Sequence, residues 1–248
     1  MASSDSGECC VCGKVTQDRC GACAEADFDL FFCSREHQKL IWPAHKLVCG
    51  PLAVPFRWPD LSQAEMQDAL LHKDAVVRLN ESADGRGELS LRSMLKSSNI
   101  GSFLTVEAFI AWLGHNDKND LGRSASQSCL LYVRQWTYHR VMRDAAPPSP
   151  AALATLSPFN LCASISFNMK MELHPSAPWW SSLHHRILAF AAVNYVSLRR
   201  GDGSYGLLLL ATAKRVLDCL KTEVAAHDPE VAAHAIGVMA RLVPVSPR

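Results

Sequence analysis

Eight cysteine and histidine residues near the start of this chain constrain its fold more than any other feature. Their spacing is Cys-x2-Cys, seven residues, Cys-x2-Cys, nine residues, Cys-x3-His, seven residues and His-x3-Cys. Eight such side chains suffice for two tetrahedral sites, the arrangement that structural zinc prefers. The spacing therefore predicts two structural zinc ions held by Cys9, Cys12, Cys20, Cys23, Cys33, His37, His45 and Cys49.

A disulfide framework is the competing explanation, because the chain has ten cysteines. Stable disulfides need an oxidising compartment. Residues 1–10 have neither the basic nor the apolar segment of a secretory signal peptide. No apolar run approaches the roughly 18 residues that a membrane-spanning helix needs. We therefore expect an intracellular protein, in the cytoplasm or the nucleus, that binds metal through its cysteines and has no membrane partner.

The chemistry of the ligand set favours structural over catalytic zinc. Protein side chains fill all the coordination positions, so none is left for water or substrate. A segment of this length buries too little apolar surface to fold securely alone. Each structural zinc contributes roughly 10–16 kcal/mol in zinc-finger peptides, which makes up the deficit.

The second half of the ligand pattern carries the resemblance to a known family. Residues 33–49 are Cys-Ser-Arg-Glu-His-Gln-Lys-Leu-Ile-Trp-Pro-Ala-His-Lys-Leu-Val-Cys, and two Cys-x2-Cys pairs precede them. Together they resemble a MYND-type zinc finger, whose usual form is Cys-x3-Cys-Gln followed by Trp-x2-His-x3-Cys. The resemblance covers residues 9–49. His37 stands where the family usually has cysteine, and histidine is a sound zinc ligand. Cys10 is an extra thiol that we expect to have no ligand role.

The resemblance implies that the two zinc sites are interleaved along the chain, whereas the spacing alone leaves the pairing open. In that arrangement one ion is held by Cys9, Cys12, Cys33 and His37. The other is held by Cys20, Cys23, His45 and Cys49. Because each site then joins both halves of a short chain, replacing Cys20 is expected to unfold the whole finger.

The resemblance also implies protein binding. MYND fingers are similar to one another in accepting short proline-rich segments, often with Leu between the prolines. Such segments are already extended and lose little entropy when they dock. The family's groove residues match Gln38 and Trp42 here. Two alternatives stay open: Trp42 caps the small core of the finger, and Gln38 is an ordinary residue of a helix surface.

The charge of the finger argues against nucleic acid as its partner. Residues 1–50 carry five Lys and Arg against seven Asp and Glu, so this segment is acidic. Phosphate binding needs the opposite sign. We therefore expect no nucleic acid to bind through the finger.

The sequence that follows the small, irregular two-zinc module predicts a mainly α-helical domain. The expected divisions are the finger at 1–50, a proline-rich linker at 51–59 and the helical domain at 60–248. A capping box at Ser62 and Glu65 begins one helix, Thr105 caps another, and Asp228 precedes the last.

Three local patterns lead to further expectations. Pro43 is expected to end or kink the helix that follows Cys33. The apolar stretch Leu161–Asn168 is the one candidate for extended structure. The adjacent His184 and His185 are expected at the surface or its boundary, because neighbouring helical residues face different directions.

The sequence favours an adaptor that binds proline-rich protein segments through the finger. One alternative is a lysine methyltransferase-like enzyme of the SET type, some of which carry such a finger. Their Asn-His-Ser-Cys segment and further cysteine cluster are not visible after residue 50, where only Cys129, Cys162 and Cys219 remain. No catalytic residue is predicted. A third interpretation treats the finger purely as a structural cap on the helical domain.

Overall fold

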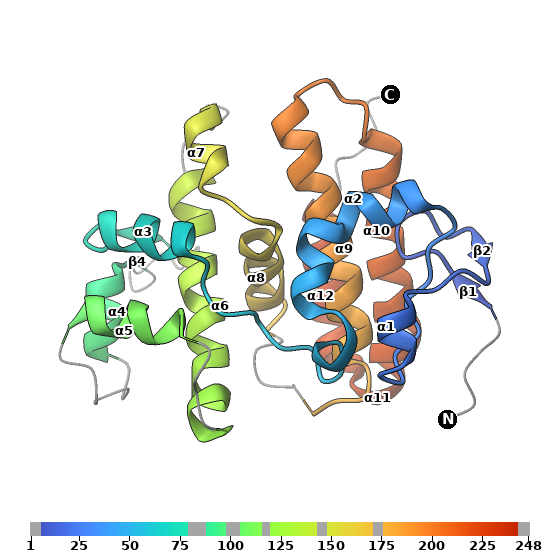
Figure 1. Cartoon of the computed structure of the whole chain (residues 1–248), viewed down its shortest axis with the longest axis horizontal. Helices are drawn as coiled ribbons and strands as arrows, with labels where there is room; N and C mark the ends of the chain where they lie inside the picture. The colour runs from blue at the N-terminus through green and yellow to red at the C-terminus, as the bar shows by residue number, and fades with distance from the viewer. Residues whose placement is uncertain are drawn as a thin grey trace. The chain divides into compact units, whose positions relative to one another are not determined.

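The computed structural model describes residues 6–78, 88–97, 105–115, 120–142, 148–170 and 176–242. These residues are mainly helical, as the sequence predicts (Figure 1). The finger contains the short elements β1 (Gly7–Glu8), β2 (Val15–Thr16), α1 (Gly21–Ala24), α2 (Arg35–His45), η1 (Lys46–Val48) and η2 (Gly50–Leu52). The middle of the chain forms α3 (Gln63–Leu71), β3 (Val77–Arg78), β4 (Glu88–Leu89), α4 (Leu91–Ser97), α5 (Val106–Leu113), α6 (Asp120–Met142) and α7 (Pro150–Ala154). The last part forms α8 (Pro158–Asn168), α9 (Trp180–Arg200), α10 (Gly206–Cys219), the π-helical turn η3 (Leu220–Val224), α11 (Ala225–His227) and α12 (Pro229–Leu242).

The chain divides into two compact units that do not follow chain order. Unit 1 joins residues 1–57 to residues 165–248, and unit 2 consists of residues 58–164. The finger is therefore grouped with the C-terminal helices. The three-part division expected from the sequence stays a prediction.

Helix α9 runs along the centre of unit 1. It contacts α10 over much of its length, and α2 of the finger packs against it (Figure 1). Buried finger residues and buried residues of α9 form one continuous hydrophobic cluster, in which Cys10, Val11 and Leu30 meet Ala189 and Val193. The finger thus shares a core cluster with the C-terminal helices. Gly201 ends α9 in the left-handed conformation that glycine adopts most easily (φ 65°).

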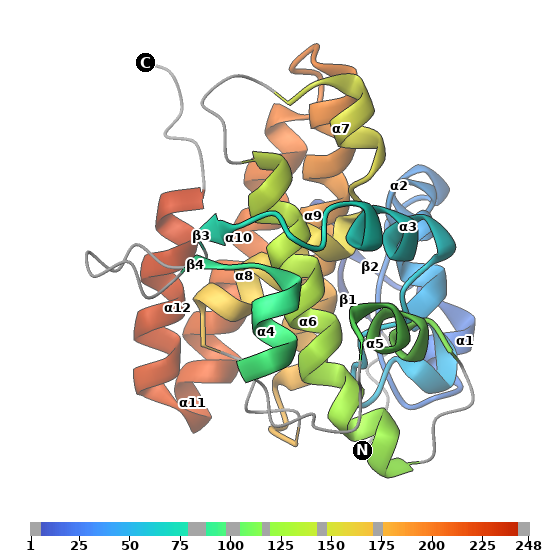
Figure 2. The same ribbon diagram turned by 90° about the vertical axis from the view of Figure 1, so that its left-hand side faces the viewer.

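Helix α6 is the longest element of unit 2, and α5 and β3 pack against it (Figure 2). The core of this unit contains large side chains with almost no exposed surface, among them Phe109, Leu130 and Trp136. The indole of Trp136 donates a hydrogen bond to the carbonyl oxygen of Ala75 at 3.3 Å. The two-stranded sheet β3–β4 is antiparallel, with Val77 opposite Leu89.

The helix starts that the sequence predicts are confirmed. The Ser62 N–H donates to Glu65 Oε2 at 2.8 Å, and the Glu65 N–H donates to Ser62 Oγ at 3.3 Å, which completes the capping box of α3. Thr105 Oγ1 accepts from the N–H of Ala108 at the start of α5. The carboxylate of Asp228 accepts from the N–H of Val231 at the start of α12.

The expectation of extended structure at Leu161–Asn168 is wrong, because these residues belong to α8. Six consecutive residues, Leu161–Ser166, are buried. The buried run includes the polar Ser164 and Ser166, so residues 163–168 alternate apolar and polar as a strand would, although they form a helix.

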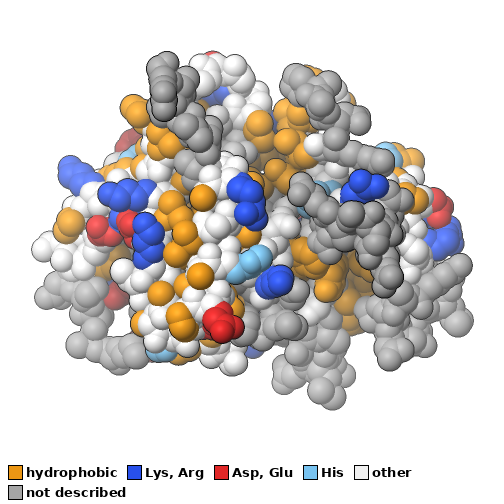
Figure 3. All heavy atoms as spheres, turned by 180° about the vertical axis from the view of Figure 1, so that it is seen from behind, with side chains coloured by type: hydrophobic (Ala, Val, Ile, Leu, Met, Phe, Trp, Pro, Cys, Tyr) orange, Lys and Arg blue, Asp and Glu red, His pale blue; other side chains and the backbone are white. Residues whose placement is uncertain are grey.

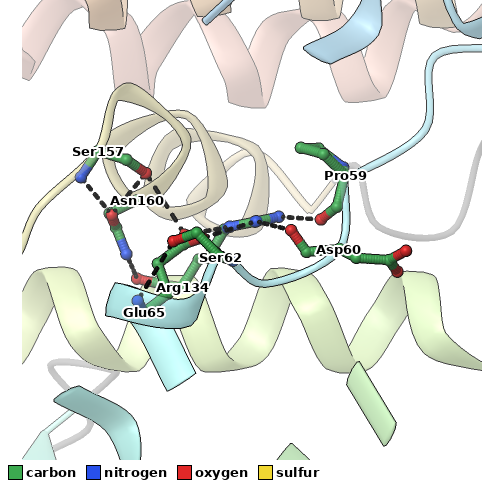
Figure 4. A network of polar contacts seen from close by, with 7 residues as sticks. All are labelled: Pro59, Asp60, Ser62, Glu65, Arg134, Ser157 and Asn160. Atoms are coloured by element: carbon green, nitrogen blue, oxygen red, sulfur yellow. Dashed lines mark hydrogen bonds and ion pairs between the residues drawn. The ribbon is translucent and has the colours of Figure 1, made fainter. Parts of the chain in front are cut away.

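A buried arginine of α6 binds the residues just before α3 and the first turn of that helix (Figure 4). The Arg134 side chain is 1% exposed and forms an ion pair with Glu65 at 2.9 Å. It also donates to the carbonyl oxygens of Pro59 at 2.8 Å and Asp60 at 3.2 Å. Burial opposes ionisation of Glu65, but the Arg134 charge and hydrogen bonds from Arg134 and Ser62 hold its pKa below the ordinary value.

In the described part of the chain, no helix combines the length and the apolar character needed to cross a membrane.

Replacing Arg134 by Met should destabilise unit 2 by about 3–5 kcal/mol, because Glu65 would stay buried without its partner. The exposed pair of Arg92 and Asp74 supplies the control, and Arg92→Met should change stability little. Since the pKa of Glu65 is lowered on folding, the stabilisation by the ion pair should be present above about pH 4.3, the ordinary glutamate value, and should be lost as the pH falls below it. Hydrogen exchange of residues 58–78 in the full chain measures the effect, and equal protection in the two variants would contradict it.

Candidate metal centre

The first pair of cysteines lies in the tight turn between β1 and β2. The Cys9 N–H donates to the Lys14 carbonyl oxygen at 2.9 Å, and the Gly13 N–H donates to the Cys9 carbonyl oxygen at 2.8 Å. Gly13 has a φ of 78°, a conformation that side chains with a Cβ rarely adopt. This turn brings the sulfurs of Cys9 and Cys12 to one side of the backbone, where both join the same cluster.

The second pair flanks the start of α1. Cys20 immediately precedes this helix and Cys23 lies within it. The Cys20 N–H donates to the Leu30 carbonyl oxygen at 2.9 Å, and the Ala24 N–H donates to the Cys20 carbonyl oxygen at 2.9 Å. These bonds fix the backbone of Cys20, and its sulfur joins that of Cys23 in one cluster.

Helix α2 carries one histidine of each predicted site. Ser34 caps the helix, and its Oγ accepts from the N–H of His37 at 3.3 Å. The expectation that Pro43 ends this helix is wrong, because α2 continues through Pro43 to His45. A kink at Pro43 stays a prediction. Pro43 is exposed and has no N–H to donate to the Lys39 carbonyl oxygen four residues earlier, and only two residues of the helix follow it.

The first cluster consists of Cys9, Cys12, Cys33 and His37. Nδ1 of His37 lies 3.6 Å from Cys9 Sγ and 3.3 Å from Cys33 Sγ. Cys12 Sγ lies 3.4 Å from Cys33 Sγ.

The second cluster consists of Cys20, Cys23, His45 and Cys49. Nε2 of His45 lies 3.5 Å from both Cys20 Sγ and Cys23 Sγ. Cys49 Sγ lies 3.5 Å from Cys20 Sγ and 3.7 Å from Cys23 Sγ.

These distances fit zinc and exclude disulfides. Zinc bonds of about 2.3 Å to sulfur and 2.0–2.1 Å to nitrogen place tetrahedral ligands about 3.6–3.8 Å apart. Within each cluster the four ligand atoms lie within 4.8 Å of one another. A disulfide needs sulfurs about 2.05 Å apart, far closer than any of these pairs. Each cluster therefore fits one zinc ion, and the interleaved pairing implied by the resemblance is confirmed.

Burial favours the metal-binding form of the histidine in the second cluster. For most of the thiols it has the opposite effect, because it disfavours the thiolate that binds metal. Burial lowers the pKa of His45 to about 4, which keeps the imidazole neutral as a metal ligand requires. Burial raises the pKa of Cys33 to about 12 and also raises the pKa of Cys23. A zinc ion supplies the positive charge that favours the thiolate form. At Cys9, burial has the same upward effect, but backbone hydrogen bonds outweigh it and lower the pKa.

Helix α9 supports the second cluster through a histidine whose role the sequence reasoning missed. The His185 ring packs edge-on against the His45 ring, with centroids 5.8 Å apart, and at 4.6 Å from Phe28. Its Nε2 lies 3.2 Å from the Ala53 carbonyl oxygen. The surface expectation for His184 and His185 is wrong, because both are buried. Helix α9 has neighbours on several sides, so adjacent residues facing different directions are both covered.

Cys10 belongs to neither cluster. It is buried in the shared core of the finger and α9, and this burial raises its pKa well above the ordinary value. Its environment is that of an apolar core residue, which agrees with the expectation that it is no ligand.

The site defines a two-zinc module in which structural metal ions link the two halves of a short chain. Comparison with protein families gives it a narrower class: residues 9–49 match the model of the MYND finger, so the chain carries a MYND finger at its N-terminus. MYND fingers are protein-interaction modules. No curated protein and no solved structure matches the chain.

Replacing Cys20 by Ser should remove most zinc and unfold the finger broadly, because α2 serves both sites. Zinc content by mass spectrometry should fall from two ions per chain to less than one. Cys10→Ala is the matched control and should keep both ions. Retention of one zinc with native-like hydrogen exchange across residues 6–49 would show that the two sites fold independently.

Proposed function

We propose that this chain is an intracellular adaptor whose finger docks proline-rich protein segments on the solvent side of α2, at Gln38 and Trp42. The observation that carries the proposal is the position of Trp42. This residue is 43% exposed, although it belongs to a module with little apolar surface to spare. Exposed tryptophan is common at the centre of protein interfaces, where its burial contributes much of the binding energy.

The surroundings of Trp42 make it suitable for recognition. The zinc ligands His37 and His45 lie on either side of it along α2, so the helix is fixed to a metal site at both ends. The Trp42 ring rests edge-on against His45 with centroids 5.9 Å apart. Gln38 is half-buried one turn earlier on the same side of the helix. A preorganised aromatic surface next to an amide group suits a proline-rich segment, which offers flat rings and backbone carbonyls.

Replacing Trp42 by Ala should weaken binding of proline-rich peptides by about tenfold or more, which is the range of an interface hot spot. The probe is a set of fluorescent peptides with Leu between two prolines, titrated into the zinc-loaded full chain. Gln38→Ala should weaken binding less, because it removes hydrogen bonds and little apolar area. Leu71→Ala, an exposed position on α3, is the control and should have no effect. The proposal fails if no peptide of the set binds, or if Trp42→Ala binds like the wild type.

The shared core favours a second role for the finger, as a structural support for the C-terminal helices. Finger residues such as Val11 and Leu30 bury apolar surface against Ala189, Ala192 and Val193 of α9. Glu8 of the finger forms an ion pair with Arg215 of α10. These contacts use the side of the finger turned toward the helices, so they do not compete with binding at Trp42.

Removing zinc from the full chain with a chelator should therefore increase hydrogen exchange in α9 and α10 as well as in the finger. The reason is that an unfolded finger no longer covers Ala189 and Val193. Adding zinc back should restore protection, which controls for damage by the chelator. Unchanged exchange across Trp180–Arg200 after complete zinc loss would contradict the supporting role.

A further inference from the structure

The solvent side of α2 carries positive charge around Trp42. Arg35, Lys39 and Lys46 are all exposed. Arg35 lies seven residues before Trp42, Lys39 three residues before it and Lys46 four residues after it. Residues at these spacings along a helix lie on the same side as the tryptophan. Gln38 completes this side. We call the surface formed by Arg35, Gln38, Lys39, Trp42 and Lys46 the basic stripe.

The basic stripe concentrates charge in a finger that is acidic as a whole. Three of the five Lys and Arg in residues 1–50 lie on it. Among the described residues, none of these three forms an ion pair within the chain, whereas Arg19 pairs with Asp29 at 2.8 Å. Ile41 and Ala44, on other sides of α2, are buried, so the stripe is the side available to a partner.

The one acidic residue of α2 offsets only part of the charge of the stripe. Glu36 lies in the first turn, and six residues separate it from Trp42, which places it about 120° away around the helix. Glu36 lies three residues before Lys39 and interacts with it, but Arg35, Lys39 and Lys46 together leave a net positive charge on this side of the helix. Elsewhere the signs are mixed: on the face shown in Figure 3, Lys and Arg lie among Asp, Glu and hydrophobic side chains. The stripe is therefore suited to select a partner by charge.

We propose that the basic stripe selects proline-rich segments that carry Asp or Glu on both sides of the prolines. This inference rests on the proposed function, because it names the partner chemistry of the same site. The dimensions agree: Arg35 and Lys46 are about 16 Å apart along a helix that rises 1.5 Å per residue. A polyproline segment of about five residues covers this length at 3.1 Å per residue. Acidic residues at its two ends then lie near the basic side chains while the apolar middle covers Trp42.

Nucleic acid fits the stripe less well than an acidic peptide does. Residues 1–50 carry more acidic than basic residues, so the field around the finger repels a long polyanion. A short peptide needs favourable charge only along the stripe itself. Screening limits charge interactions to about 10 Å at 0.1 M salt, so the acidic residues beyond that range matter little for such a peptide.

The test compares three peptides with one proline core and different ends. The sequences are Asp-Pro-Ser-Leu-Ser-Pro-Asp, Ser-Pro-Ser-Leu-Ser-Pro-Ser and Lys-Pro-Ser-Leu-Ser-Pro-Lys, each titrated into the zinc-loaded full chain. The acidic peptide should bind about three- to tenfold more tightly than the neutral one at low salt, as expected for a few exposed ion pairs. This preference should disappear in 0.5 M NaCl, while binding of the neutral peptide persists.

Charge reversal on the protein should reverse the preference. Lys39→Glu with Lys46→Glu should favour the lysine-ended peptide over the acidic one by about three- to tenfold, because the charge facing the peptide ends changes sign. The control with equal charge change is Lys14→Glu with Lys214→Glu, at two exposed positions outside the stripe. The control should keep the preference of the wild type. Zinc content confirms that both variants remain folded.

The possible results separate this inference from the proposed function. If all three peptides bind equally and lose affinity in Trp42→Ala, the docking function stands and charge selection is overturned. If none binds, both fail. If a 12-base-pair DNA duplex binds more tightly than the acidic peptide, and Lys39→Glu with Lys46→Glu abolishes that binding, the stripe recognises phosphate and the inference is overturned.

Discussion

The rest of unit 1 depends on one short helix, α2. This helix supplies a ligand to each of the two metal sites. His37 at one end of α2 joins Cys9, Cys12 and Cys33, and His45 at the other end joins the second cluster. Structural zinc contributes roughly 10–16 kcal/mol per ion, which is comparable to the whole stability of a typical domain. The same helix packs against α9 on its buried side, so the metal sites, the shared core and the basic stripe all follow from its position.

The features that could be predicted from the sequence are those set by local spacing. The zinc ligands follow fixed intervals because each pair must point at one ion, and the capping residues Ser62 and Thr105 act on backbone groups three residues away. The assignment of ligands to the two zinc sites needed the family resemblance, because the four ligand pairs along the chain can be combined into two sites in several ways. These predictions succeed because the chemistry involves neighbours along the chain or a ligand geometry that zinc itself imposes.

The features that could not be predicted depend on contacts between distant segments. His185 supports His45 across 140 positions, and no local pattern marks such a contact. The pattern of Leu161–Asn168 is ambiguous because residues 163–168 alternate apolar and polar as a strand would, while Ser164 and Ser166 are in fact buried in a helix. The grouping of the finger with residues 165–248 follows from a core assembled from both ends of the chain, and sequence order gives no sign of it.

The discontinuous make-up of unit 1 has a consequence for the timing of synthesis. The finger is complete at Cys49, but α9 begins only at Trp180, after the whole of unit 2. At 5–20 residues per second, the ribosome takes on the order of ten seconds to make the intervening chain. During that interval Val11 and Leu30 have no α9 to cover them. A nascent chain that binds zinc early therefore presents a folded finger with an uncovered apolar side, a surface on which chaperones act before the C-terminal helices arrive.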